Sequence, residues 1–267
     1  MLFKDIPQDF KTNVKIYFNK ILKTVKENGN YLSINGTLVP KNLRTGHQNL
    51  EIGSEKHINV MIESLYLLHL FHNFSINNNI FYSIFYGNLL GYYRENDIIM
   101  WDDDVDIIIV NKNGINTLLE LWRKGGQEYP IWDKHWSYKN ITLNDSSIIL
   151  IKCQKFKVKN YWFKLRLNTQ INKNELRDLG GIDLILRTDI DMAYNSDLTV
   201  LNKYEETDIN YPIVKYGPIY ARVLVKKPTT IILNNQYGIN WKKKIHPSLH
   251  KDFDIVTRSS ARHWRST

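Results

Sequence analysis

Four aspartates stand together just before an apolar run: Asp102, Asp103, Asp104 and Asp106 precede the residues Ile107 to Val110. Side chains alternate along a strand, so Asp102, Asp104 and Asp106 would share one face if the strand already begins there. Paired carboxylates on one face can hold Mg²⁺, or Mn²⁺, while water and a substrate phosphate complete the coordination. The alternative is an acidic turn that merely caps a strand, but like charges this close repel one another unless a cation neutralises them.

The order of acids and apolar residues separates two classes of metal-dependent transferase. Glycosyltransferases that use nucleotide sugars usually carry their Asp-x-Asp after an apolar strand. In this sequence the apolar run follows the acids, and a glycine-flanked segment, residues 87–91, lies upstream. That arrangement resembles nucleotidyltransferases of the DNA polymerase beta type.

A longer pattern narrows the resemblance to one family. The segment Gly87-Asn88-Leu89-Leu90-Gly91, then Arg94, then Trp101-Asp102-Asp103-Asp104-Val105-Asp106-Ile107 resembles the core signature of the LicD/fukutin family. Gly181-Ile182-Asp183-Leu184 resembles a later strand of that family, and Tyr237, Gly238 and Trp241 resemble its C-terminal Y-G-x-x-W. The resemblance covers about residues 60–245.

The resemblance implies a Mg²⁺-dependent phosphotransferase on a nucleotidyltransferase fold. Such an enzyme moves phosphocholine or an alditol phosphate such as ribitol phosphate from a CDP-linked donor to the hydroxyl of a glycan acceptor, and CMP leaves. Carried over to this chain, Asp104 and Asp106 are the expected metal ligands and Asp183 the third carboxylate of the catalytic set. Asp183 would either complete the metal site or accept the proton of the acceptor hydroxyl. For Asp102 and Asp103 a supporting or loop role is equally open.

Six residues are predicted to bind substrate: Gly87, Asn88, Arg94, Asp102, Lys164 and Arg166. Gly87 would let the backbone approach a phosphate, and Asn88 stands where the family usually has Thr. Arg94 would act as a phosphate fork, or else lie on the surface of a turn. Lys164 and Arg166 share a strand face that either meets the donor phosphates or is solvated. For Tyr237 and Trp241 the alternative is a packing role at the C-terminal helix.

The hydrophobic periodicity predicts an α+β fold, with a nucleotidyltransferase-like mixed β-sheet flanked by helices and an N-terminal helical extension. Helices are expected at 8–27, 55–74, 113–125 and about 228–237, and strands at 80–86, 105–110, 148–153, 161–167 and 181–186. Residues 87–91 are expected to form a turn, followed by a polar loop to Trp101. The expected domains are a helix and loop-rich connector (1–54), a catalytic domain (55–257) and a loose tail (258–267).

Composition bounds the class of protein. The formal charge of +9 among 267 residues suits an anionic partner, yet no nucleic-acid-binding signature accompanies it. The single Cys153 excludes a disulfide framework or a cysteine-built zinc site. Without an apparent signal peptide or membrane span, a cytoplasmic protein is expected, with a small-molecule donor and a glycan acceptor as partners. His135 could line the acceptor pocket.

Two rival hypotheses are nucleotidyl transfer from an NTP, which would release pyrophosphate, and a polyanion-binding module without activity.

Overall fold

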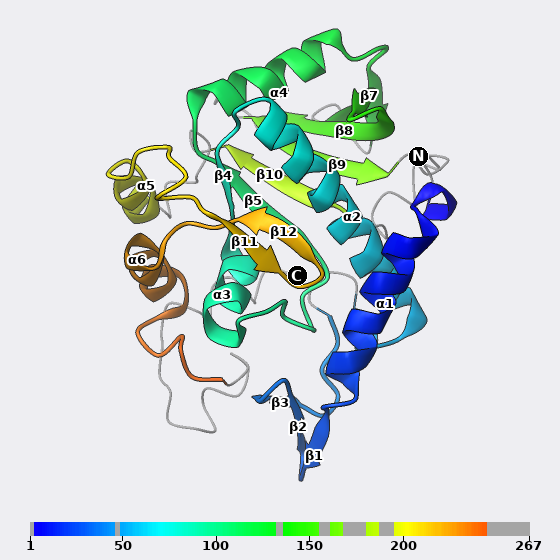
Figure 1. The fold of residues 1–267 in the computed structure, drawn as a ribbon, viewed down its shortest axis with the longest axis vertical. Helices are drawn as coiled ribbons and strands as arrows, with labels where there is room; N and C mark the ends of the chain where they lie inside the picture. The colour runs from blue at the N-terminus through cyan, green and yellow to red at the C-terminus, as the bar shows by residue number, and fades with distance from the viewer. Residues whose placement is uncertain are drawn as a thin grey trace.

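The computed structural model describes residues 3–45, 49–131, 136–154, 161–167, 180–186 and 195–244. In these residues the chain forms an α+β fold built on a seven-stranded mixed sheet with flanking helices, and a helix and a small sheet precede it in the sequence (Figure 1). The fold class predicted from the sequence is confirmed. His135 and the expected tail at 258–267 lie outside the described residues.

The main sheet contains all five strands predicted from the sequence. Its spatial order is β4 (Tyr82–Ile84), β5 (Val105–Ile109), β10 (Ile182–Leu186), β9 (Tyr161–Leu167), β8 (Ser146–Gln154), β7 (Trp136–Leu143) and β6 (Tyr129–Ile131). The β5–β10 pair is parallel, and the other pairings are antiparallel. The apolar residues of β5 and β10 are buried on both faces, as expected for neighbouring central strands.

Two helices pack on the main sheet, and the N-terminal helix packs against one of them. The longest, α2 (Glu55–Asn77), begins where the Ser54 side chain accepts a hydrogen bond from His57 N, and it lies across β9, β10 and β5 (Figure 1). The helix α4 (Lys112–Lys124) is capped in the same way, because Asn111 Oδ1 accepts from Gly114 N. The helix α1 (Gln8–Leu22) follows a short 3₁₀ turn at Phe3–Asp5 and packs against α2.

The structure corrects several element predictions. The helix expected at 8–27 ends at Leu22, and the expected connector holds an antiparallel sheet of β1 (Lys26–Asn28), β2 (Tyr31–Ile34) and β3 (Thr37–Pro40). The expected turn at 87–91 is instead the start of a helix, α3 (Tyr86–Glu95). Its two glycines suggest a turn from sequence, yet they serve close packing in the folded chain. The short strands β6 and β7 and the helix α5 (Asn195–Leu201) were not predicted separately.

A C-terminal hairpin and helix complete the side of the sheet next to β4. The hairpin pairs β11 (Ile213–Tyr216) with β12 (Ile219–Arg222), and α6 (Lys226–Tyr237) follows, as the sequence predicted. Tyr82 Oη accepts a hydrogen bond from Arg222 N, and Ser83 Oγ accepts one from Leu224 N. These bonds attach the end of the hairpin to β4. The hairpin therefore lies beside the strand that leads into α3 (Figure 1).

Candidate active site

Two of the three predicted metal-binding acids stand side by side on the central strands. In the parallel pairing of β5 and β10, Asp106 is in register with Asp183. Partners in register on adjacent strands project to the same face of a sheet. Asp104 directly precedes β5, and its charge acts on Asp106. The structure thus brings together carboxylates that are far apart in the sequence.

The next strand adds a cation to the same row. Lys164 on β9 is in register with Asp183, and its Nζ lies 2.6 Å from Asp183 Oδ2. The two side chains are only 21% and 10% exposed, so the pair is held in a largely dry environment. Of the two predicted basic residues on β9, Lys164 therefore reaches the acids directly.

Burial and neighbouring charges raise the pKa values of two of the acids, Asp106 and Asp102. Loss of solvent is the largest cause for Asp106, and the charges of Asp104 and Asp183 add to it, so its pKa lies well above the usual range. The ammonium of Lys164 acts in the opposite direction. The pKa of Asp102 is also raised well above its usual value, first by loss of solvent and then by the neighbouring Asp104. Such crowding of negative charge is what a bound cation would relieve.

Gly87 provides the space that Asp102 occupies. A Cβ at Gly87 would overlap Oδ2 of Asp102, so only glycine lets this carboxylate rest against the first turn of α3. One helical turn later, a Cβ at Gly91 would lie 2.7 Å from the carbonyl oxygen of Asp97. Both glycines face the loop that returns along α3 from Asn96, whose φ of 56° reverses the chain. In this structure Gly87 accommodates the carboxylate of Asp102, and its predicted contact with a substrate phosphate remains a prediction.

Asn88 ties this helix to the acid-bearing strand. Its Oδ1 accepts a hydrogen bond of 2.6 Å from Asp106 N, and its Nδ2 donates one of 3.3 Å to the carbonyl oxygen of Asp104. The side chain is 2% exposed. Its amide therefore fixes the backbone on both sides of Val105, and the predicted contact with substrate remains a prediction.

The other two predicted cationic residues are placed differently. Arg94 is buried rather than on a surface turn, and its Nε lies 2.6 Å from Glu95 Oε1. Arg166 lies against Gly181, where a Cβ would overlap its guanidinium. Its charge also lowers the pKa of Glu63 on α2. Arg166 therefore lies against Gly181 and acts on a carboxylate of α2, whereas Lys164 pairs with Asp183.

Two tyrosines beside the acids extend the site. Tyr216, at the end of β11, is 1% exposed, and Tyr237, at the end of α6, is 6% exposed. Burial raises the pKa of each hydroxyl well above its usual value, and the charge of Asp102 is the next largest cause for both. Tyr237 was singled out from the C-terminal motif, whereas nothing in the sequence marked Tyr216. The accompanying Trp241 donates from Nε1 to Asn234 Oδ1 and serves packing.

The carboxylates offer the oxygen ligands that Mg²⁺ prefers. Across the described ranges, no three His, Cys, Asp or Glu side chains are already arranged around one point as metal ligands. The ammonium of Lys164 occupies one oxygen of Asp183 in this arrangement. The donor set nevertheless fits a hard cation, because the charges of Asp104 and Asp183 both act on the carboxyl of Asp106.

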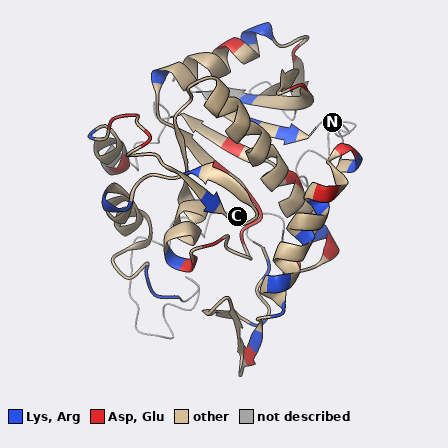
Figure 2. Cartoon of the chain, in the orientation of Figure 1, with Lys and Arg blue, Asp and Glu red and all other residues tan. Residues whose placement is uncertain are grey.

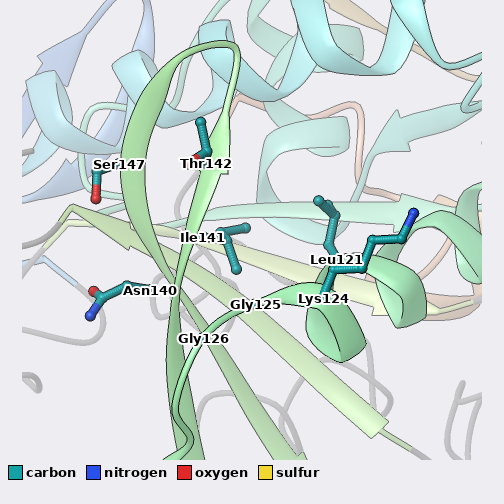
Figure 3. A pocket seen from close by; sticks show the side chains of 8 residues that line it. All are labelled: Leu121, Lys124, Gly125, Gly126, Asn140, Ile141, Thr142 and Ser147. Atoms are coloured by element: carbon teal, nitrogen blue, oxygen red, sulfur yellow. The ribbon is translucent and has the colours of Figure 1, made fainter.

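A surface cavity elsewhere is separate from this site. It has a volume of about 360 Å³ and lies between the end of α4 and the β7–β8 hairpin (Figure 3). Its lining residues are Leu121, Lys124, Gly125, Gly126, Asn140, Ile141, Thr142 and Ser147. None of the predicted site residues contributes to it. Lysine and arginine residues are spread over several helices and strands (Figure 2).

The helices that the structure describes include none with the length and hydrophobicity needed to cross a bilayer.

Comparison with known families gives a match over residues 79–181 to LicD/FKTN/FKRP, nucleotidyltransferase domain. This segment contains α3, the acid cluster and Lys164, while Asp183 lies just beyond it. No curated protein matches the chain. The family predicted from the sequence is confirmed for this segment, and it implies a transferase of phosphoryl or sugar-phosphate groups.

Proposed function

We propose that this chain, whose residues 79–181 form a LicD/FKTN/FKRP nucleotidyltransferase domain, transfers a phosphorylated alcohol from a CDP-linked donor to a glycan hydroxyl. The transferred group would be phosphocholine or an alditol phosphate such as ribitol phosphate. The observation that carries the proposal is the alignment of Asp106 with Asp183 on adjacent parallel strands, with Lys164 in the same row.

The proposed reaction is a displacement at the phosphorus that bears the alcohol. The acceptor hydroxyl oxygen forms a bond to the phosphorus that bears the alcohol, and the bond from that phosphorus to the bridging oxygen of CMP breaks. Asp183 would accept the hydroxyl proton, and Lys164, whose Nζ lies 2.6 Å from Asp183 Oδ2, would stabilise its charged form before the transfer. The electron pair of the broken bond leaves with CMP.

A divalent cation, Mg²⁺ or Mn²⁺, would be held by Asp104 and Asp106 with Asp183 as a possible third ligand. When bound, it supplies neutralisation of the charge that develops on the departing phosphate. The protein holds the acids at the required place through Asn88, which bonds the backbone of Asp104 and Asp106. Rigid placement of this kind is what phosphoryl transfer chiefly needs from a protein.

The direct test is release of CMP. CDP-choline and CDP-ribitol would each be incubated with Mg²⁺, a mixed glycan acceptor pool and wild type, Asp106→Asn or Asp183→Asn. Asp145→Asn is the matched control, because Asp145 is exposed in the β7–β8 turn. We expect CMP from wild type and the control, and at least a hundredfold less from the two site variants.

Other products would redirect the proposal. Pyrophosphate released from an NTP, without CMP from either donor, would replace it with nucleotidyl transfer. Steeply salt-dependent polyanion binding that survives Asp104→Asn, with no turnover of any donor, would indicate a binding module. The cytoplasmic location and the lack of a nucleic-acid partner also remain predictions.

A further inference from the structure

The guanidinium of Arg94 pairs with Glu95 through Nε, while its Nη2 has no described partner. Its side chain is 3% exposed, and Nε lies 2.6 Å from Glu95 Oε1. Its Nη2 is buried and has no hydrogen-bond partner among the residues that the structure describes. A buried donor that is left without a partner destabilises the folded state. A donor kept in that state calls for an explanation, and a ligand that binds there is one.

Arg94 lies on the side of α3 that is near the acid cluster. Arg94 follows Gly87 by two helical turns, so both lie on the face of α3 along which the Asp97–Asp102 loop returns. The neighbourhood of Tyr237 agrees with this position. The charges of Asp102 and Asp106 raise the pKa of the Tyr237 hydroxyl, and the charge of Arg94 lowers it.

Through Nε, Arg94 pairs with Glu95, and Glu95 in turn contacts two residues outside the family-matched segment 79–181. Glu95 Oε2 accepts a hydrogen bond of 2.5 Å from Thr37 Oγ1 and lies 3.7 Å from Lys244 Nζ. Thr37 is fully buried on β3, and the neighbouring Leu38 N donates to the carbonyl oxygen of Lys244. One carboxylate thus serves two cations, Arg94 and Lys244. Within the group of Arg94, Glu95 and Lys244 the two cations outnumber the one carboxylate, while Asp102 and Asp106 lie nearby.

We propose that Thr37 and Glu95 are positioning residues that hold Arg94 so that its Nη2 binds a phosphate of the donor diphosphate. The anion site follows from the geometry of Arg94, and its assignment to the donor rests on the proposed function. Because Thr37 belongs to the region before residue 55, that region forms part of the site rather than a separate extension.

Titration calorimetry with inorganic pyrophosphate and with CDP, each in Mg²⁺, tests this inference. Thr37→Val removes the hydroxyl at nearly constant volume, and Thr37→Ser restores it. Thr117→Val is the matched control, since its hydroxyl donates to Asn113 O within α4. We expect Thr37→Val to weaken pyrophosphate binding about tenfold, equivalent to about 1.4 kcal/mol, while Thr37→Ser and Thr117→Val bind like wild type. Melting temperatures of all four proteins separate folding from binding.

Each outcome bears on the inference. A lower melting temperature for Thr37→Val with unchanged pyrophosphate affinity would show a purely structural role and overturn it. Wild type that fails to bind pyrophosphate would overturn it as well. Pyrophosphate binding that depends on the Thr37 hydroxyl, without any preference for CDP, would support the inference and remove the cytidine part of the proposed function.

Discussion

Asp106 and Asp183 face the same side of the sheet from neighbouring parallel strands, in direct register. Their carboxylates would repel each other strongly in a dry site, and Lys164 on the next strand offsets that repulsion through Asp183. The arrangement joins the signature segment of the family to a strand that lies just beyond it. The following predictions test the contacts that hold this row and the surrounding loop in place.

Removing the cation should expose the repulsion within the row. Lys164→Met keeps most of the side-chain volume but leaves Asp183 beside Asp106 without a counter-charge. We expect the metal-free variant to lose about 3 kcal/mol in free energy of unfolding, and added Mg²⁺ to restore part of it. Urea denaturation with EDTA or Mg²⁺ measures both. Lys124→Met, which breaks an exposed ion pair with Glu120, should cost under about 1 kcal/mol.

Gly87 should tolerate no side chain. Gly87→Ala places a methyl group where the carboxylate of Asp102 lies, so either Asp102 or the loop must move. We expect a loss of about 1–3 kcal/mol in stability and of CMP-releasing activity. The control Gly126→Ala meets no atom within 4 Å and should behave like wild type. Thermal unfolding of the two variants makes the comparison, and equal melting temperatures would contradict the close contact.

Glu63 predicts a defined pH dependence of stability. Burial on α2 raises the pKa of its carboxyl from 4.5 to about 7, although Gly180 N and the charge of Arg166 lower it. Because the folded state binds this proton more tightly than the unfolded state, the protein loses stability as pH rises from about 4.5 to 7. Glu63→Gln still accepts from Gly180 N through its amide oxygen. We expect it to flatten this pH dependence and to gain about 3 kcal/mol at pH 8 relative to wild type.

Chemical denaturation of wild type and Glu63→Gln at several pH values measures the difference. Identical pH profiles for the two proteins would refute the raised pKa. A profile for wild type that rises over this range would indicate that carboxylates with lowered pKa values dominate instead.

Tyr17 on α1 should stabilise the loop that leads to the acids. Its hydroxyl donates a hydrogen bond to Asp97 Oδ1, which also accepts from Ile98 N. Tyr17→Phe should reduce stability by about 1–3 kcal/mol, because a bond to a charged group is lost inside the fold. Tyr220→Phe, at an exposed position of β12, is the matched control. Hydrogen exchange of the 97–102 amides should increase in Tyr17→Phe alone, and unchanged exchange would argue against the coupling.

Local patterns in the sequence determined much of the architecture. The apolar periodicity of α2 and α4 and the β-branched runs of β5 and β10 identify those elements, because burial selects the same spacing wherever the segment packs. The acid cluster was visible for a similar reason: like charges at close spacing are costly without a cation, so the sequence predicted a cation-binding site there.

Only the tertiary structure decided the partners of the key residues. Gly87 and Gly91 suggested a turn, yet they lie within a helix because a loop from the following segment packs against them. Arg94 is paired with Glu95, which also contacts Thr37 and Lys244 from segments far apart in the sequence. Tyr216 reaches the acids because its hairpin is attached to β4. The sequence specifies these residue types, but their contacts depend on segments brought together by folding, and local spacing carries no information about them.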